Sequence, residues 1–279
     1  MEKEGKYIYC IVGTSQERNF GPIGIGGKGD EVLTVGYKDL SMVVSNHPMS
    51  KFVVNRENML AHEKVIEEVM KEFNSVLPVR FGTVASGADE IRNLLDRRYR
   101  EFKNLLRDMD HKIELGVKGR WKNMNLIFKE IAEENKEIKR LKEKIQNNPP
   151  EFPPTLLYKR GAGGDFKGRL GGFSNGVQAK MEIGKMVEKA LAKKKGKEAE
   201  KIVDTLRRAA IEYKLNKTVG DEMFMNAAFL VDKGREKEFD NIMDDLSDQY
   251  KGRIKFMYTG PLPVFNFVNI VIYPEEWER

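Results

Sequence analysis

Two apolar segments, each interrupted by proline and glycine, constrain the fold of this chain more than any other feature. The first runs from Val76 to Val84 and the second from Thr259 to Val268. Both combine strand-forming residues with Pro and Gly, which fix turns and are tolerated in sheets at edges or strand ends. Neither segment places a nucleophile beside a base or gathers metal ligands. We therefore interpret both segments as parts of β-sheets rather than as catalytic loops.

The length and composition of the chain favour two soluble domains. A chain of 279 residues is longer than a typical single domain. Hydrophobic residues make up 40% and charged residues 33%, which is enough for a core with a wet surface. The net charge of +6 is small, and its two signs are interleaved. Nucleic-acid binders usually concentrate their basic residues on one face, so no nucleic-acid partner is expected.

Cysteine content and hydropathy indicate a protein of the cytoplasm. Cys10 is the single cysteine, so no internal disulfide can form, and its apolar surroundings predict a buried thiol. The charged start of the chain is unlike a signal peptide. No apolar run approaches the roughly 18 residues that a membrane span requires. We therefore expect a cytoplasmic protein without a membrane partner.

Hydrophobic periodicity predicts an α+β domain over residues 1–110. Strands are expected at Lys6–Val12, Val32–Val35 and Leu40–Val44. A helix is predicted from an N-cap at Asn55 to Phe73, and a second helix begins at Asp89. The first of these helices repeats apolar residues at helical spacing, which predicts that its buried stripe consists of Met59, Leu60, Val65, Ile66, Val69 and Phe73.

The second half, residues 111–279, follows the order strand, helical excursion, two strands, helix, strand. Strands are expected over 112–121, 211–215, 224–231, 254–258 and 264–272, and a helix is expected over 236–250. The excursion covers about 122–208, with a helix over 124–145 and an irregular Pro- and Gly-rich segment over 149–176. This βαββαβ order is that of a ferredoxin-like domain, an antiparallel sheet with helices on one face. The other face of such a sheet is open to a partner.

Several motifs, in order and in both halves, resemble the gas vesicle protein F/L family. They are Tyr7-Ile8-Tyr9, Ala61–Glu67 followed by Leu77–Val84, Asn226–Val231, and Thr259–Pro263 with Phe267-Val268. The residues that carry the family's structural motifs are Gly82, Asn226, Gly260, Pro261 and Pro263. The chain departs from the family pattern at Leu262–Phe265, and the segment 149–176 resembles an insertion or a divergent stretch.

The resemblance implies a non-enzymatic accessory protein of gas vesicle assembly, without a cofactor. Family members are thought to contact the hydrophobic shell subunit, gas vesicle protein A, and other accessory proteins. They reside in the cytoplasm and at the gas vesicle. A subunit built to present an apolar face to gas aggregates unless that face or its strand edges are covered. A sheet with a free face or edge provides such cover by hydrophobic contact or strand addition.

The candidate contact surface is the segment around Pro78, because proline within a strand indicates an edge. Its proposed partner-binding residues are Leu77, Pro78, Arg80, Phe81 and Thr83. Arg80 stands between apolar residues, so its charge must be paired or reach the surface. Two interpretations stay open: a salt bridge to Glu63 or Glu67, and a contact with a partner.

Other chemical motifs are weak. Gly24–Gly29 fits the dinucleotide pattern GxGxxG, but a strand rather than a helix follows it. His62-Glu63 begins like HExxH, yet Ile66 stands in place of the second zinc ligand. An alternative function is RNA binding by the ferredoxin-like domain, with the basic run Lys193–Lys201 as contact. The predicted strands lack the aromatic RNP1 pattern. A small-molecule enzyme is disfavoured by the scarcity of His and Cys.

Overall fold

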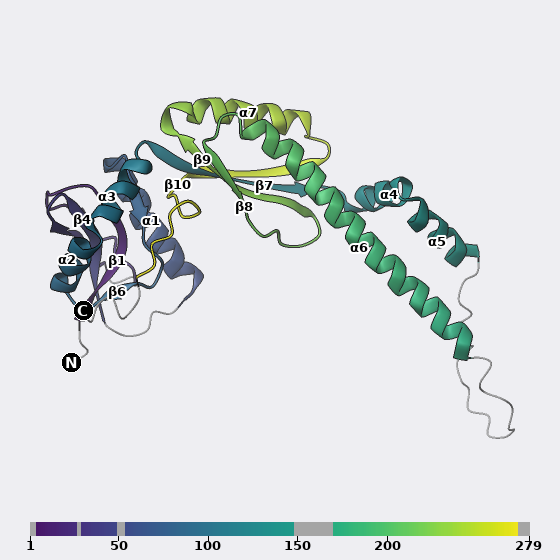
Figure 1. Cartoon of the computed structure of the whole chain (residues 1–279), viewed down its shortest axis with the longest axis horizontal. Coiled ribbons are helices and arrows are strands. Elements are labelled where there is room, and N and C mark those ends of the chain that lie inside the picture. Colours follow the sequence, from purple (N-terminus) through teal and green to yellow (C-terminus); the bar gives the residue numbers. More distant parts are fainter. Residues whose placement is uncertain (1–3, 27–28, 49–53, 148–169, 273–279) are drawn as a thin grey trace, which may run out of the picture.

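The computed structural model describes residues 4–26, 29–48, 54–147 and 170–272 and shows an α+β protein with two antiparallel sheets (Figure 1). The strands of the first sheet are β1 Glu4–Val12, β2 Asn19–Gly21, β3 Val32–Tyr37, β4 Leu40–Pro48, β5 Val76–Pro78 and β6 Val84–Ala85. Their order is β2-β3-β4-β1-β5, and β6 also pairs with β1. The first predicted strand, β1, is therefore an interior strand, paired with β4 on one side and with β5 and β6 on the other.

Helices cover both faces of the first sheet (Figure 1). Helix α1 (Arg56–Glu72) packs Val65, Ile66 and Val69 against Tyr7 and Tyr9 on one face. Helices α2 (Ala88–Arg97) and α3 (Tyr99–Asp108) contribute apolar side chains to the other face, where Ile8 and Ile11 lie. The apolar run of β1 shows no alternation because both of its faces are buried. The single helix predicted from Asp89 is in fact two, α2 and α3.

The second sheet has the order β10-β7-β9-β8. Its strands are β7 Lys112–Trp121, β8 Glu212–Leu215, β9 Met223–Asp232 and β10 Ile254–Leu262, and every neighbouring pair is antiparallel. The helices between these strands are α4 Met124–Glu134, α5 Lys136–Asn147, α6 Leu170–Leu206, the short 3-10 helix η1 Lys233–Arg235 and α7 Glu236–Gln249. Side chains of α6 and α7 form one core with the apolar face of β7 and β9.

The long helix α6 extends well beyond the second sheet, with α4 and α5 beside it (Figure 1). A network of charges ties these elements to the sheet. Arg253, just before β10, donates to Glu130 of α4 at 2.6 Å and to Glu198 of α6 at 2.5 Å. The indole Nε1 of Trp121 donates to Glu198 at 2.6 Å, and Lys194 pairs with Glu130 at 2.9 Å. The helical excursion is thereby fixed to the sheet at its base.

Two predictions for the excursion were wrong in detail. The helix expected over 124–145 is broken at Asn135 into α4 and α5. The backbone of Asn135 is extended and ends α4. Helix α6 begins at Leu170, inside the segment predicted to be irregular, despite Gly171 and Gly172. The remainder of that segment, residues 148–169, lies outside the described residues.

The segment after β10 leaves the second sheet and returns to the first (Figure 1). Its apolar side chains join the core of the first sheet: Val264, Val268, Ile270 and Ile272. The strand predicted over 264–272 is wrong, because only one parallel bridge, Val79 to Ile270, forms there. Pro263 lacks an N–H for a ladder, and the amides of Phe267 and Val268 bond back to the Val264 carbonyl in a turn.

A buried carboxylate holds this segment on the helix-free face of the second sheet. Glu114 of β7 is only 3% exposed. Its carboxylate accepts hydrogen bonds from the backbone N–H of Asn266 at 2.8 Å and from its side-chain Nδ2 at 2.6 Å. Burial raises the pKa of Glu114, and the Asn266 hydrogen bonds oppose that effect. The face that the sequence left open to a partner is thus partly covered by the chain itself.

Candidate partner-binding groove

A groove of about 810 Å³ lies where α1, the turn after β5 and the segment after β10 meet. We call it the junction groove. Three stretches of chain that are distant in sequence line it: Val54, Asn55, Arg56, Met59, Leu60, His62 and Glu63 from α1 and its start; Pro78, Val79, Arg80 and Phe81 after β5; and Phe265, Val268, Asn269, Ile270 and Val271. The groove therefore depends on the whole length of the folded chain.

The rim of the junction groove is apolar and exposed. Met59 and Leu60 are 51% and 52% exposed, Val54 is 74% exposed and Phe265 is 40% exposed. The sequence predicted Met59 and Leu60 as core residues, and this prediction was wrong. Helix α1 buries Val65, Ile66 and Val69 as predicted, but the side chains of Met59 and Leu60 in its first turns stay exposed. Clustered exposed apolar side chains of this kind mark interaction sites.

His62 lies in the wall of the groove and is 3% exposed. The Gly82 amide donates to the Tyr7 hydroxyl at 3.0 Å, and that hydroxyl lies 2.9 Å from His62 Nδ1. The hydroxyl can donate its single proton to Nδ1, and in that arrangement the neutral ring carries its own proton on Nε2. Nε2 has no hydrogen-bond partner among the described residues. Burial lowers the pKa of His62 to about 4, the nearby Val79 carbonyl opposes that effect, and the ring is neutral at pH 7.

Two arginines stand at the groove without an acidic partner. Arg56 and Arg80 are exposed, and within the described part of the chain neither forms a salt bridge. The predicted pairing of Arg80 with Glu63 or Glu67 is therefore absent from the described residues. Burial and the neighbouring Glu67 raise the pKa of Glu63. Among the residues that the structure describes, Glu63 forms no salt bridge.

The structure separates the predicted contact residues into two groups. Pro78, Arg80 and Phe81 line the junction groove, whereas Leu77 is fully buried in the core of the first sheet. Thr83 lies outside the groove, and its hydroxyl donates to the Arg80 carbonyl at 2.7 Å. The sequence predicted Arg80 within a strand, but the residue lies in the turn between β5 and β6. The prediction that Pro78 marks an edge agrees with the terminal position of β5.

Glycine is required at two of the predicted motif positions. Gly82 adopts φ +85° in the turn that presents Arg80 and Phe81. Gly260 adopts φ +148°, and a Cβ there would lie 2.5 Å from the Leu115 side chain. Asn226 donates from Nδ2 to the Lys217 carbonyl at 3.0 Å and holds the connection between β8 and β9. Pro261 and Pro263 lie at the end of β10, where the chain turns toward the first sheet.

Sequence reasoning missed the part of the groove that follows β10. Phe265, Val268 and Ile270 were assigned to a closing strand, and no local pattern indicates that they return to α1. The motif that contains Phe267-Val268 was the only signal at this position. The sequence placed His62 in the family motif Ala61–Glu67 and in an incomplete zinc motif, but its partner Tyr7 could not be predicted because the two residues are far apart in sequence.

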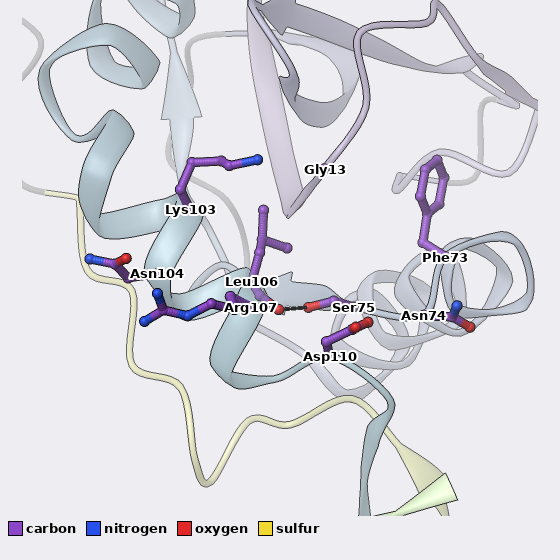
Figure 2. Close-up of a pocket in the computed structure, with 9 residues that line it drawn as sticks. All are labelled: Gly13, Phe73, Asn74, Ser75, Lys103, Asn104, Leu106, Arg107 and Asp110. Atoms are coloured by element: carbon purple, nitrogen blue, oxygen red, sulfur yellow. Dashed lines mark hydrogen bonds between the residues drawn. The ribbon is translucent and has the colours of Figure 1, made fainter.

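A second cavity of about 500 Å³ lies between α3 and the end of α1 (Figure 2). Its cations already have acceptors: Lys103 pairs with Asp39 at 2.6 Å and Arg107 with Asp108 at 3.2 Å. The hydroxyl of Ser75 donates to the Leu106 carbonyl at 2.7 Å, as Figure 2 shows. The polar groups of this cavity are thus largely satisfied, so the junction groove is the stronger candidate site.

Comparisons with known proteins extend over nearly the entire chain. The family model described as gas vesicle synthesis protein GvpL/GvpF matches residues 5–269. The chain is 24% identical to gas vesicle protein F1 of Halobacterium salinarum over 98% of this chain and 97% of that protein. It is 26% identical to gas vesicle protein F of a Streptomyces species over 94% of this chain and 98% of that protein.

Two crystal structures share the fold. GvpF from Anabaena has a TM-score of 0.73 at 19% identity, and the match covers 96% of this chain and 100% of that one. GvpF from Microcystis aeruginosa has a TM-score of 0.72 at 20% identity, covering 95% and 99%. In the described residues, no helix is both long and apolar enough to cross a membrane. The resemblance inferred from the motifs is confirmed, and the chain belongs to the GvpL/GvpF family of gas vesicle synthesis proteins.

Proposed function

We propose that this protein is a non-enzymatic accessory factor that binds the hydrophobic shell subunit, gas vesicle protein A, and aids nucleation of the vesicle. Membership of a family of gas vesicle synthesis proteins supports the setting. The observation that carries the proposal is the apolar rim of the junction groove, formed by Val54, Met59, Leu60 and Phe265. An apolar groove covers part of a subunit that would otherwise aggregate.

The proposal places the protein in the cytoplasm and at the growing vesicle, with other accessory proteins as further partners. It also treats the chain as two domains, 1–110 and 111–279. The second domain is proposed to be ferredoxin-like, and its βαββαβ element order and the strand order β10-β7-β9-β8 support this assignment. Edges β8 and β10 give that sheet two further surfaces for accessory partners.

RNA binding, the alternative function, has less support. RNA-recognition sheets stack bases on aromatic side chains of their open face. Here that face carries the buried carboxylate of Glu114 and the segment around Asn266. A carboxylate repels the phosphate backbone, and the segment covers part of the surface on which bases would stack.

Co-expression with the shell subunit tests the proposed function. We expect the shell subunit to remain soluble and to co-purify with the full chain, and to pellet when expressed alone. A shell subunit that pellets equally with and without this protein would contradict the proposal. A parallel titration with a labelled single-stranded RNA, at two salt concentrations, tests the alternative. Tight, salt-dependent RNA binding without shell binding would replace the proposed function.

A further inference from the structure

The junction groove contains cationic and hydrogen-bond donor side chains that lack matching acidic partners among the described residues. Arg56 and Arg80 have no acidic partner among residues 4–26, 29–48, 54–147 and 170–272. His62 is 3% exposed, and its Nε2 forms no hydrogen bond of normal geometry there, although the Val79 carbonyl lies near the ring. A buried donor without an acceptor costs about 1–3 kcal/mol. Such a group is retained where a partner supplies the acceptor.

The backbone adds to this preference for acceptors. The start of α1, from Val54 to Arg56, lines the groove, and a helix N-terminus carries partial positive charge. Arg56 stands in the first turn, where a cation is unfavourable for the helix itself. Its position is therefore better explained by an external anion than by the stability of α1.

The acidic groups nearby do not cancel this field. Glu57 lies in the first turn of α1, and Glu63 is the one acid among the residues that line the groove. Glu63 forms no salt bridge with Arg56 or Arg80, and burial and the neighbouring Glu67 raise its pKa. Arg56 and Arg80 therefore remain available to carboxylates of a partner.

We propose that the junction groove receives an apolar segment of the shell subunit that is flanked by Asp or Glu. The inference rests on the proposed function. The apolar side chains of the segment contact Met59, Leu60 and Phe265, and its carboxylates pair with Arg56 and Arg80. A carbonyl or carboxylate oxygen of the same segment accepts the proton of His62 Nε2 once the exposed Phe265 ring, 6.3 Å from the His62 ring, moves aside.

The test uses the full chain and an array of overlapping synthetic peptides that covers the shell subunit. The wild-type chain is compared with the double variant Arg56→Glu and Arg80→Glu. The matched control is Arg100→Glu with Arg140→Glu, two exposed residues of α3 and α5 outside the groove with the same change in net charge. We expect the retained peptides to hold an apolar run beside Asp or Glu.

Charge reversal at the groove should weaken binding of those peptides at least about tenfold, while the control binds like the wild type. Peptides whose acidic residues are replaced by Lys should no longer bind the wild-type chain. They should bind the groove variant, whose two glutamates replace the arginines. His62→Phe should weaken binding, and His62→Gln, which keeps a donor, should restore part of it. Circular dichroism and thermal unfolding establish that each variant is folded.

The outcomes separate the two proposals. If the wild-type chain retains the shell subunit on co-expression but the groove variant binds the peptides equally well, the acid-flanked segment is wrong and the proposed function stands. If retained peptides carry no acidic residue, the inference is also overturned. If the wild-type chain binds neither the shell subunit nor any peptide, the proposed function fails and the inference fails with it.

Discussion

At the scale of single residues, His62 connects the core of the first sheet to the surface. Its Nδ1 accepts from the Tyr7 hydroxyl, which itself accepts from the Gly82 amide. This chain of hydrogen bonds links α1, β1 and the turn that presents Arg80. The ring of His62 and the turn that carries Arg80 are therefore joined through the Tyr7 hydroxyl.

The first prediction concerns acid stability. Burial lowers the pKa of His62 to about 4 from 6.5, so the unfolded chain binds more protons than the folded chain between these values. The free energy of unfolding should fall as the pH drops from 6.5 to 4, by up to roughly 3 kcal/mol from this residue. Urea unfolding at pH 7 and pH 4 measures this loss. In His62→Gln the loss should be smaller by about that amount, and an identical loss would contradict the assignment.

The second prediction separates binding from stability on α1. Leu60→Ser removes an exposed apolar side chain of the groove, so the free energy of unfolding should change by less than about 0.5 kcal/mol. Co-purification of the shell subunit should decrease. The control Leu95→Ala, at a fully buried position of α2, should instead cost about 2–5 kcal/mol. Denaturant unfolding and co-expression give both quantities, and unchanged shell binding by Leu60→Ser would argue against the groove.

Single residues also show where the sequence was a sufficient guide. Cys10 is buried as predicted, and Asn55 caps α1 by accepting from the Asn58 amide. Both properties are local, since an apolar run or a capping residue reveals them. The exposure of Met59 and Leu60 is not local. It depends on where the sheet and the segment after β10 end beneath α1.

At the scale of elements, the segment after β10 is held by polar contacts at Asn266 and by apolar contacts on both sides of it. Asn266 gives two hydrogen bonds to Glu114, and its carbonyl accepts from Lys214 Nζ at 2.8 Å. Val264 and Val268 pack in the core of the first sheet. The segment thus connects the two sheets.

The third prediction tests this connection. Asn266→Ala removes a donor to a buried carboxylate, so the free energy of unfolding should fall by about 1–3 kcal/mol at pH 7. Asn269→Ala, an exposed neighbour in the same segment, should change it by less than about 0.5 kcal/mol. Because the pKa of Glu114 is raised, lowering the pH protonates it and should reduce the deficit of Asn266→Ala. An equal effect of the two alanines would contradict the role of Asn266.

Elements with strong periodicity were predicted well, and those set by tertiary contacts were not. The strands β1, β7 and β9 and the helices α1 and α7 follow from their apolar patterns. The expected strand over 264–272 failed because its apolar residues pack against another sheet rather than in a ladder. A pattern of apolar residues records burial, but it does not record which surface buries them.

At the scale of the whole molecule, two sheets with separate cores share one strip of chain. Leu230 of β9 belongs to the same apolar cluster as Ile8 and Val264, so the cores are in contact at this strip. The order of elements was readable from the sequence. The pairing of α1 with residues 265–271 was not, because nothing in either segment identifies the other.

The fourth prediction follows from the shared strip. The full chain should unfold in a single calorimetric transition, because the segment after β10 couples the two cores. A chain ending at Leu262 lacks Val264, Val268, Ile270 and Ile272. It should unfold in two separate transitions with a less stable first sheet. In the double variant Val264→Ala with Val268→Ala, the stability of the first sheet should be intermediate between those of the full chain and the shortened chain. A single unchanged transition in the shortened chain would rule out this coupling.

The route of the chain also sets the order of events during synthesis. The strip that closes the junction groove is translated after α1, after the turn at Arg80 and after every helix of the second half. The walls of the groove that come from α1 and from the turn at Arg80 are therefore made well before the strip that completes it. The groove is complete only when that strip has folded back onto the first sheet.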